Sequence, residues 1–164
     1  MQALNVGCHD IHISEMLNID IDPAMKPDLL LDCTKLAEHF DQESIDFVYM
    51  GHFLEHLSIQ EGKKVVADIF HILKQYGSVV ITIPDYTKCD GLTITEVESV
   101  VIAGGQHKTL MNIERVKEYM HEAGFCTIAE IQPKETPHCP FPEVTWQTSA
   151  IGIKHPVVRF HGIN

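Results

Sequence analysis

Four short apolar runs in the first half of the sequence each end on a residue that a ligand site can use. These end residues are Gly7, Asp20, Asp32 and Gly51. A carboxylate accepts hydrogen bonds from ligand hydroxyl or amino groups, and a glycine lets a ligand come close to the backbone because it has no Cβ. If the runs are parallel strands, their carboxyl ends meet at one edge of the sheet, where open sheets bind ligands. The four positions therefore predict one ligand crevice.

Three of the eleven histidines are placed to do acid–base chemistry. His52 and His56 follow the fourth run directly, and His107 lies in a long segment after the fifth. A neutral imidazole is well suited to take a proton near neutral pH, so we expect one of these rings to face the reacting group. The alternative is that they are surface or helix-capping histidines. Asp85 and Tyr86 are further candidates for the same role.

Metal binding is not expected from the spacing of the histidines. The pairs His9/His12 and His52/His56 could each bring two imidazoles together. A structural zinc site needs four ligands at characteristic spacings, and neither pair belongs to a known signature. No cysteine or carboxylate spacing supports such a site either.

Composition narrows the class of protein and of partner. The formal charge of −11 and the scattered Lys and Arg residues argue against nucleic acid and against an anionic membrane surface. No apolar run approaches the roughly 20 residues of a bilayer span, and residues 1–20 lack the pattern of a signal peptide, so a cytoplasmic location is expected. The five cysteines include no CxxC pair and are expected to be reduced thiols. At 164 residues the chain predicts a single domain, 1–164.

The elements that must position these residues alternate between strands and helices. The clearest helix has its apolar face on residues 65–73, with Ser58 and Glu61 at the spacing of a capping box and Gly77 expected just past its last turn. The connection between the first two strands is too short for a helix, because a full crossover takes about a dozen residues or more. Strands are predicted at 3–8, 16–20, 28–32, 45–51 and 78–84.

The second half of the chain predicts a lid and a strand pair. Residues 85–111 show no clean period, and a loop of this length inside a compact domain is usually functional, so this segment is the expected lid or insert. A helix is expected from a cap at Asn112 to Gly124. Residues 126–132 and 148–154 are expected to be antiparallel strands joined by a Pro-rich loop. A short helix is expected within 33–44. The predicted fold class is α/β, with a doubly wound, mostly parallel sheet and an antiparallel last strand.

An ordered set of motifs resembles the class I S-adenosylmethionine-dependent methyltransferases, and most closely the small methyltransferase type 11 group. The resemblance covers roughly residues 3–132 and extends to 154. It implies a seven-stranded sheet with an antiparallel last strand, and S-adenosylmethionine as cofactor. The motifs are LNVGC (4–8), LNIDIDP (17–23), DLLLD (28–32), IDFVYMGHFLEHL (45–57), ILKQYGSVVITIP (72–84) and EAGF (122–125).

The resemblance also implies a role for each residue at the strand ends. The loop after the first strand would lie against the methionine part of the cofactor, and Asp20 would bind the two ribose hydroxyls, with Asp22 as the alternative. Asp32 would meet the adenine amino group, or else only cap the helix that follows it. The implied cofactor-binding set is Asn5, Gly7, Cys8, His9, Asp20, Asp32, Cys33, Met50 and Gly51.

Departures from the family pattern define the alternatives. His9 stands where the family has a second glycine, and no Asn/Asp-Pro-Pro-Tyr motif follows the fourth strand. No helical extension precedes the first strand, so the 85–111 segment or a second subunit of a homodimer would have to cover the cofactor. We expect methyl transfer to a small-molecule acceptor. The alternatives are a non-catalytic methyltransferase-like protein that has lost its cofactor, and a nucleotide-dependent oxidoreductase, which the lack of GxGxxG disfavours.

Overall fold

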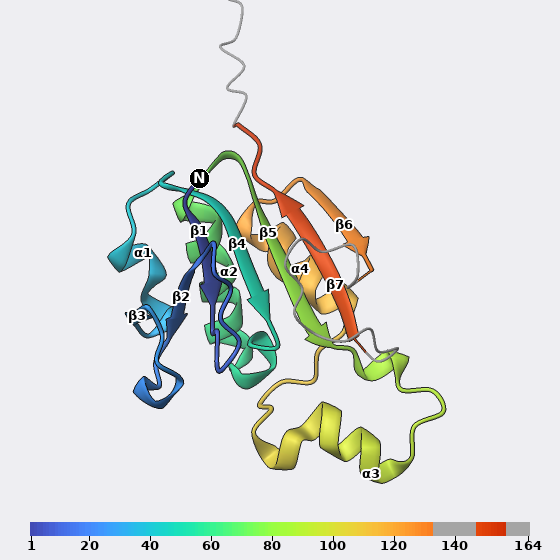
Figure 1. The fold of residues 1–164 in the computed structure, drawn as a ribbon. Helices are drawn as coiled ribbons and strands as arrows, with labels where there is room; N and C mark the ends of the chain where they lie inside the picture. Colours follow the sequence, from blue (N-terminus) through green and yellow to red (C-terminus); the bar gives the residue numbers. More distant parts are fainter. Residues whose placement is uncertain (133–146, 157–164) are drawn as a thin grey trace, which may run out of the picture.

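A seven-stranded sheet forms the centre of the computed structural model, which describes residues 1–132 and 147–156. The strand order is β3-β2-β1-β4-β5-β7-β6. Strands β1 to β5 run parallel to one another, whereas β7 is antiparallel to both β5 and β6 (Figure 1). This confirms the predicted fold class. The strands are β1 (Ala3–Val6), β2 (Leu17–Asp20), β3 (Leu29–Leu30), β4 (Ile45–Gly51), β5 (Leu73–Pro84), β6 (Thr127–Ile131) and β7 (Gln147–Ile153).

The central strands are buried on both sides, as their continuous apolar sequences predict. All residues of β1 are buried, and so are residues 79–84 of β5. The carboxyl ends of β1, β2, β4 and β5 point toward the segment that carries α3 (Ile94–Val97) (Figure 1). These ends therefore share one edge of the sheet, where Gly7, Asp20 and Gly51 were expected to meet.

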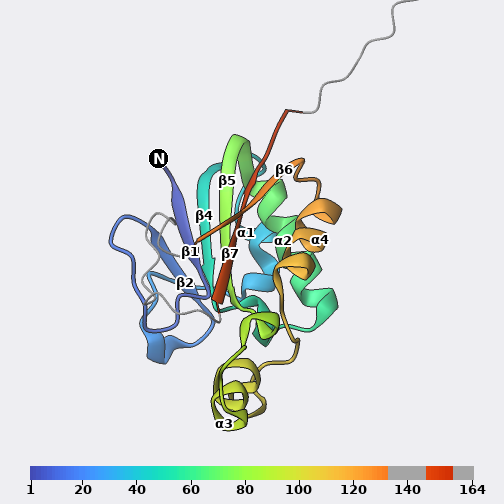
Figure 2. The same ribbon diagram turned by 90° about the vertical axis from the view of Figure 1, so that its right-hand side faces the viewer.

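Helices α1 (Leu36–His39), α2 (Ile59–Ile72) and α4 (Ile113–Ala123) cover one face of the sheet (Figure 2). Helix α2 buries Val65, Val66, Ile69 and Ile72, the apolar face that the 3.6-residue spacing predicts. The predicted cap of α4 at Asn112 is confirmed by its bond from the Arg115 backbone N–H, and Gly124 ends the helix with φ +112°.

The opposite face is covered differently, because the connection between β1 and β2 contains no helix. Ile13 and Met16 of that connection pack against Ala3, Tyr49 and Val80 of the sheet in a second, smaller core cluster. The prediction of an abbreviated first crossover is thus confirmed.

Two predicted elements differ from the structure. Helix α2 ends at Ile72, and Gly77 lies inside β5 instead of past the helix. The left-handed residue is Tyr76, with φ +65°, and a Cβ on Gly77 would lie 2.9 Å from the Lys74 carbonyl oxygen. Gly77 is therefore explained by close backbone packing at an irregularity of β5 and not by a helix end.

The 85–111 segment is helical where a long aperiodic loop was expected. It contains η4 (Tyr86–Lys88), α3, the π-helical turn η5 (Glu98–Ile102) and η6 (Ala103–Gly105). Each piece is too short to show a period in the sequence. Together they project from the carboxyl edge of the sheet (Figures 1 and 2).

The predictions about the Pro-rich loop and the cysteines can be followed only in part, and the one about membrane spans only within the described ranges. The Pro-rich loop and Cys139 lie outside the described ranges, and the other four cysteines are free thiols. Within the described ranges, no helix has the length and apolar character needed to cross a membrane.

The capping box of α2 gives a test of the fold. The Ser58 hydroxyl accepts from the Glu61 backbone N–H, and the Ser58 N–H donates to the Glu61 carboxylate at 2.9 Å. We expect Ser58→Ala to lower the free energy of unfolding by about 1 kcal/mol, because α2 is packed on the core. Thr93→Ala is the matched control: it removes the same type of cap from α3, which buries no residue, and should cost less in urea denaturation. Equal losses of unfolding free energy in the two variants would contradict the conclusion that the cap of α2 matters because this helix packs on the core.

Candidate functional site

The loop after β1 begins with a glycine that has no room for a side chain. Gly7 has φ +67°, and a Cβ at this position would lie 2.3 Å from Cδ2 of Phe53. Phe53 follows β4, so its ring closes over the backbone of the β1 loop from the neighbouring strand end. Glycine is required here by backbone conformation and by the contact with Phe53.

His9 has a left-handed backbone, with φ +47°, although it is not a glycine. The position where the family has its second glycine therefore has the conformation that favours glycine. The imidazole does not fill the crevice: the side chain is 71% exposed, and Nδ1 lies 2.8 Å from the Asp10 carboxylate.

Asp20, at the end of β2, holds the β1 loop in place. Its Oδ2 accepts from the backbone N–H of His9 at 2.9 Å, and its Oδ1 accepts from the N–H of Asp22, also at 2.9 Å. Each carboxylate oxygen can accept a further bond. Asp22 instead caps η1 (Pro23–Met25) by accepting from the Ala24 N–H. Asp22 therefore has the geometry of a helix cap.

Two cavities lie at the carboxyl edge of the sheet, with volumes of about 480 and 360 Å³. Both fall within the roughly 300–1,000 Å³ typical of ligand pockets. They share Gly7, Asp20, Phe53 and His56, so the Phe53 ring and the β1 loop stand where the two cavities meet. The larger cavity is also lined by Cys8, His9, Gly51 and His52, and the smaller by Asp32, Cys33, Thr34 and Lys108.

Asp32 both caps a helix and faces the smaller cavity. Its Oδ1 accepts from the hydroxyl and the backbone N–H of Thr34, and these bonds hold the pKa of Asp32 below its usual value. Burial raises the pKa of Cys33 to about 12 and that of Cys8 to about 11, so both thiols are neutral. The smaller cavity therefore has one carboxylate beside an apolar thiol.

Asn5 and Met50 do not line either cavity. The Asn5 amide donates to the Ile11 carbonyl at 2.8 Å and to Asn18 Oδ1 at 3.0 Å, which ties the β1–β2 connection to the sheet. Met50 is fully buried in the main core cluster. Both residues were predicted to line the crevice because each comes shortly before a loop that does line it.

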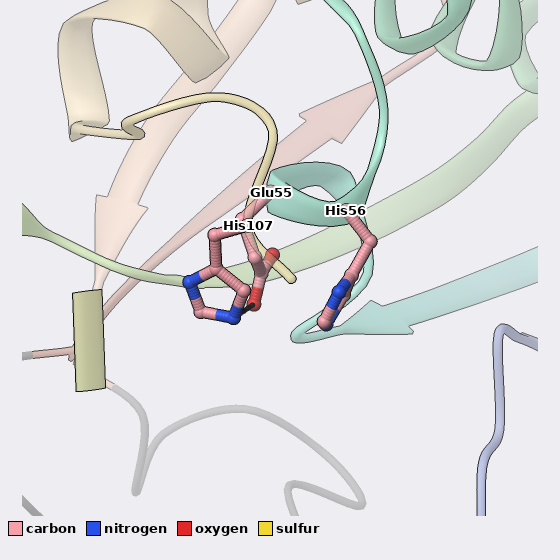
Figure 3. A group of neighbouring side chains, drawn as sticks. All are labelled: Glu55, His56 and His107. Atoms are coloured by element: carbon pink, nitrogen blue, oxygen red, sulfur yellow. Dashed lines mark ion pairs between the residues drawn. The ribbon is translucent and has the colours of Figure 1, made fainter. Parts of the chain in front are cut away.

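The three candidate histidines come together around one buried carboxylate. Glu55 is 1% exposed and lies between His52, whose Nδ1 is 3.5 Å from Oε1, and His107, whose Nε2 is 4.0 Å away. The ring centroids of His56 and His107 are 4.7 Å apart (Figure 3). Burial raises the pKa of Glu55 to about 8 and lowers the pKa of His52 and His56.

His107 reaches this cluster because its segment is fastened to the turn after β4. The backbone N–H groups of Lys108 and Thr109 donate to the Glu55 carbonyl at 2.8 and 3.1 Å, and the Thr109 hydroxyl donates to the Leu57 carbonyl at 2.7 Å. The end of the 85–111 segment thus forms a wall of the crevice.

Sequence reasoning missed Glu55, Phe53, Gln106 and Lys108 as residues of the site. Gln106 lines the larger cavity and Lys108 the smaller one. The sequence did contain a signal for Glu55, because this carboxylate directly precedes His56 in the turn at a strand end.

The contact between Gly7 and Phe53 gives a direct test of the crevice. Gly7→Ala should lower the free energy of unfolding by about 1–2 kcal/mol for the left-handed backbone, plus about 1–3 kcal/mol for the clash with the ring. Gly91→Ala is the matched control, since Gly91 has φ +86° but no atom within 4 Å of a Cβ. Chemical denaturation of both variants measures the difference. If Gly91→Ala cost as much, the contact with Phe53 would have no energetic weight.

The left-handed backbone at His9 gives a second test. His9→Gly relieves about 1 kcal/mol of backbone strain in the folded state. Glycine also raises the conformational entropy of the unfolded chain, which costs a similar free energy on folding. The free energy of unfolding should therefore stay equal or rise by up to about 1 kcal/mol. His9→Ala keeps the strain and is the matched control. Because the imidazole is exposed, the affinity for S-adenosylhomocysteine, the demethylated product of the cofactor that the sequence resemblance implies, should stay the same or fall in a calorimetric titration. A tenfold gain would show that the imidazole obstructs the cavity.

Comparison with known proteins agrees with this architecture. The sequence profile of a family described as "Methyltransferase domain" matches residues 4–81. No curated protein matches the chain significantly in sequence. A S-adenosylmethionine-dependent methyltransferase from Archaeoglobus fulgidus has a similar structure, with a TM-score of 0.72, 15% identity, and coverage of 93% of this chain and 86% of that one.

Two further solved structures are similar. A S-adenosylmethionine-dependent methyltransferase from Thermotoga maritima has a TM-score of 0.70 and 16% identity over 93% of this chain and 82% of that one. Phosphoethanolamine N-methyltransferase 2 of Haemonchus contortus, in complex with phosphomonomethylethanolamine and S-adenosylhomocysteine, has a TM-score of 0.69 and 16% identity over 95% of this chain and 49% of that one. The resemblance found in the sequence is confirmed: the chain has the class I S-adenosylmethionine-dependent methyltransferase fold, and residues 4–81 match the methyltransferase-domain family.

Proposed function

We propose that this protein transfers a methyl group from S-adenosylmethionine to a small-molecule acceptor. The observation that carries the proposal is the position of Asp20: its carboxylate ends β2, fixes the β1 loop and faces both cavities. Two solved neighbours contain S-adenosylmethionine or S-adenosylhomocysteine, which supports the same cofactor here.

The lining of the two cavities fits the parts of this cofactor. The methionine part would lie in the larger cavity against Gly7, Cys8 and His9. The ribose would lie at Asp20, whose two oxygens can each accept one more hydrogen bond. The adenine would lie in the smaller cavity, beside Asp32 and Cys33. Gly51 lines the larger cavity without a side chain, as the proposed role requires.

The acceptor would occupy the end of the larger cavity bordered by His52, His56 and Gln106. The cofactor supplies a sulfonium methyl group. When the acceptor nucleophile forms its bond to the methyl carbon, the carbon–sulfur bond breaks and its electrons stay on sulfur. The protein's contribution is to hold the acceptor in line, which can supply several kcal/mol. His52, His56 or His107 would take the proton that the acceptor releases.

The size and charge of the site favour a small acceptor over a macromolecular one. The larger cavity has a volume of about 480 Å³ and is lined by Gln106, and the net charge of −11 disfavours a phosphate backbone. The Haemonchus neighbour was solved in complex with a small phosphorylated amine, phosphomonomethylethanolamine, which supports the proposal of a small acceptor here.

Asp20 and Asp22 together provide the test of the cofactor site. Asp20→Asn keeps the shape of the side chain but loses the charge, and should weaken S-adenosylhomocysteine binding by about 1.5–3 kcal/mol, the range for hydrogen bonds to a charged group. Asp22→Asn is the matched control, because Asn also caps helices and Asp22 lines neither cavity. Isothermal titration calorimetry measures both variants.

Two outcomes would change the conclusion. An equal or larger loss at Asp22 would move the ribose site to that residue. Wild-type protein that takes up neither S-adenosylmethionine nor its demethylated product would be a non-catalytic domain with the methyltransferase fold.

A further inference from the structure

Three side chains with metal-ligating atoms converge beside the larger cavity. Glu55 and His56 belong to the 3₁₀ turn η3 (Leu54–His56) after β4, and His107 comes from the end of the 85–111 segment. One ligand atom from each lies within 4.8 Å of the others (Figure 3). Among the described residues no other such group of three or more occurs.

Glu55 lacks the partners that a buried carboxylate needs. It is 1% exposed, and neither carboxylate oxygen has a hydrogen-bond partner among the described residues. Imidazole nitrogens of His52 and His107 stand 3.5 and 4.0 Å from Oε1. A buried charge without a partner is costly, and each unsatisfied buried group in a native protein needs an explanation, of which an ion is one.

His107 is held in the tautomer that binds a metal. Its Nδ1 lies 2.8 Å from the Val101 carbonyl oxygen. Because a carbonyl only accepts, Nδ1 carries the hydrogen, and Nε2 of the neutral ring presents its lone pair to Glu55. Metal-binding histidines commonly donate their second ring N–H to a backbone carbonyl in this way.

His52 has a similar arrangement at the edge of the group. Its Nε2 lies 3.1 Å from the Gln147 side-chain oxygen, and its Nδ1 faces Glu55. The ring therefore stands next to the three converging ligands without being one of them. It borders the larger cavity together with His56.

We propose that Glu55, His56 and His107 bind a divalent transition-metal ion such as Zn²⁺. Two imidazoles and one carboxylate form a ligand set typical of catalytic zinc sites, which keep a further position open for water or substrate. Ligand atoms about 2.0–2.2 Å from one ion lie roughly 3.3 Å apart. Ligand atoms that now lie up to 4.8 Å apart must therefore come closer by up to about 1.5 Å. The half-buried His56 ring borders both cavities, and its rotation would shorten this spacing.

The open position would face the larger cavity, because His56 lines that cavity. An acceptor oxygen bound there would lose its proton more readily, since a metal ion lowers the pKa of an oxygen ligand. This consequence rests on the proposed methyl transfer, whereas binding of the ion does not. The sequence did not predict the site, because His107 is far from Glu55 and His56 in the chain and local spacing does not reveal their convergence.

Metal titration of the stripped protein tests the proposal. After dialysis against chelator, the wild type should bind one Zn²⁺ per chain in calorimetry and give Co²⁺ absorption bands of a site with nitrogen ligands, with no comparable binding of Mg²⁺. Residues that only orient a ligand change metal affinity by about 10–100-fold, so loss of a direct ligand in His107→Gln or Glu55→Gln should weaken Zn²⁺ binding by at least about 100-fold. His121→Gln is the matched control, because it removes an exposed imidazole of α4 outside the group.

A stability measurement separates loss of the ion from loss of the fold. Glu55→Gln keeps the shape of the side chain and removes the charge, so without metal its melting temperature should equal or exceed that of the wild type. Only the wild type and His121→Gln should gain melting temperature when Zn²⁺ is added. The proposal is overturned if the wild type takes up no stoichiometric Zn²⁺, or if the Glu55 and His107 variants bind it as the wild type does. S-adenosylhomocysteine titrated in the presence of chelator tests the cofactor site separately.

Discussion

Two backbone hydrogen bonds to one carbonyl decide the shape of the functional edge of this domain. The N–H groups of Lys108 and Thr109 both donate to the carbonyl of Glu55, which joins the end of the 85–111 segment to the turn after β4. This junction places Gln106 and Lys108 at the two cavities and brings His107 next to His56. It also places His107 Nε2 4.0 Å from the buried carboxylate of Glu55. Without the junction the strand ends would offer acids and a glycine loop, but neither a second wall nor a histidine cluster.

Two of the non-glycine residues with a left-handed backbone lie at the same edge. His9 and His52 are left-handed without being glycine, with φ +47° and +52°. His9 lies in the loop after β1, His52 directly follows β4, and both border the larger cavity. Such conformations cost about 1–3 kcal/mol and persist where the surroundings hold them. Here the His9 N–H is held by the carboxylate of Asp20 and the His52 N–H by the carbonyl of Thr82, both at 2.9 Å. The parallel sheet thus supplies the groups that keep the strained loops in place.

Sequence patterns predicted well whatever depends on local chemistry. The apolar runs located β1, β2, β4 and β5, and the capping box of Ser58 located the start of α2. Sequence patterns did not predict features that depend on contacts between distant parts of the chain. Gly77 was assigned to a helix end because its packing against β4 backbone is a tertiary contact. The helical turns of 94–105 are too short for a period, and the convergence of Glu55 with His107 requires contact between distant segments.

The insertion of β7 between β5 and β6 has a consequence for how the chain folds during synthesis. β5 pairs with β4 on one side and with β7 on the other, and among the described strands β6 pairs only with β7. Until residues 147–153 have left the ribosome, β5 therefore presents a free edge that includes Val80 and Ile81, and β6 has no strand to join. Open apolar strand edges attract other chains. The nascent chain therefore passes through an aggregation-prone stage, which ends when β7 pairs with β5 and β6. A pause in translation after β6 should make that stage longer.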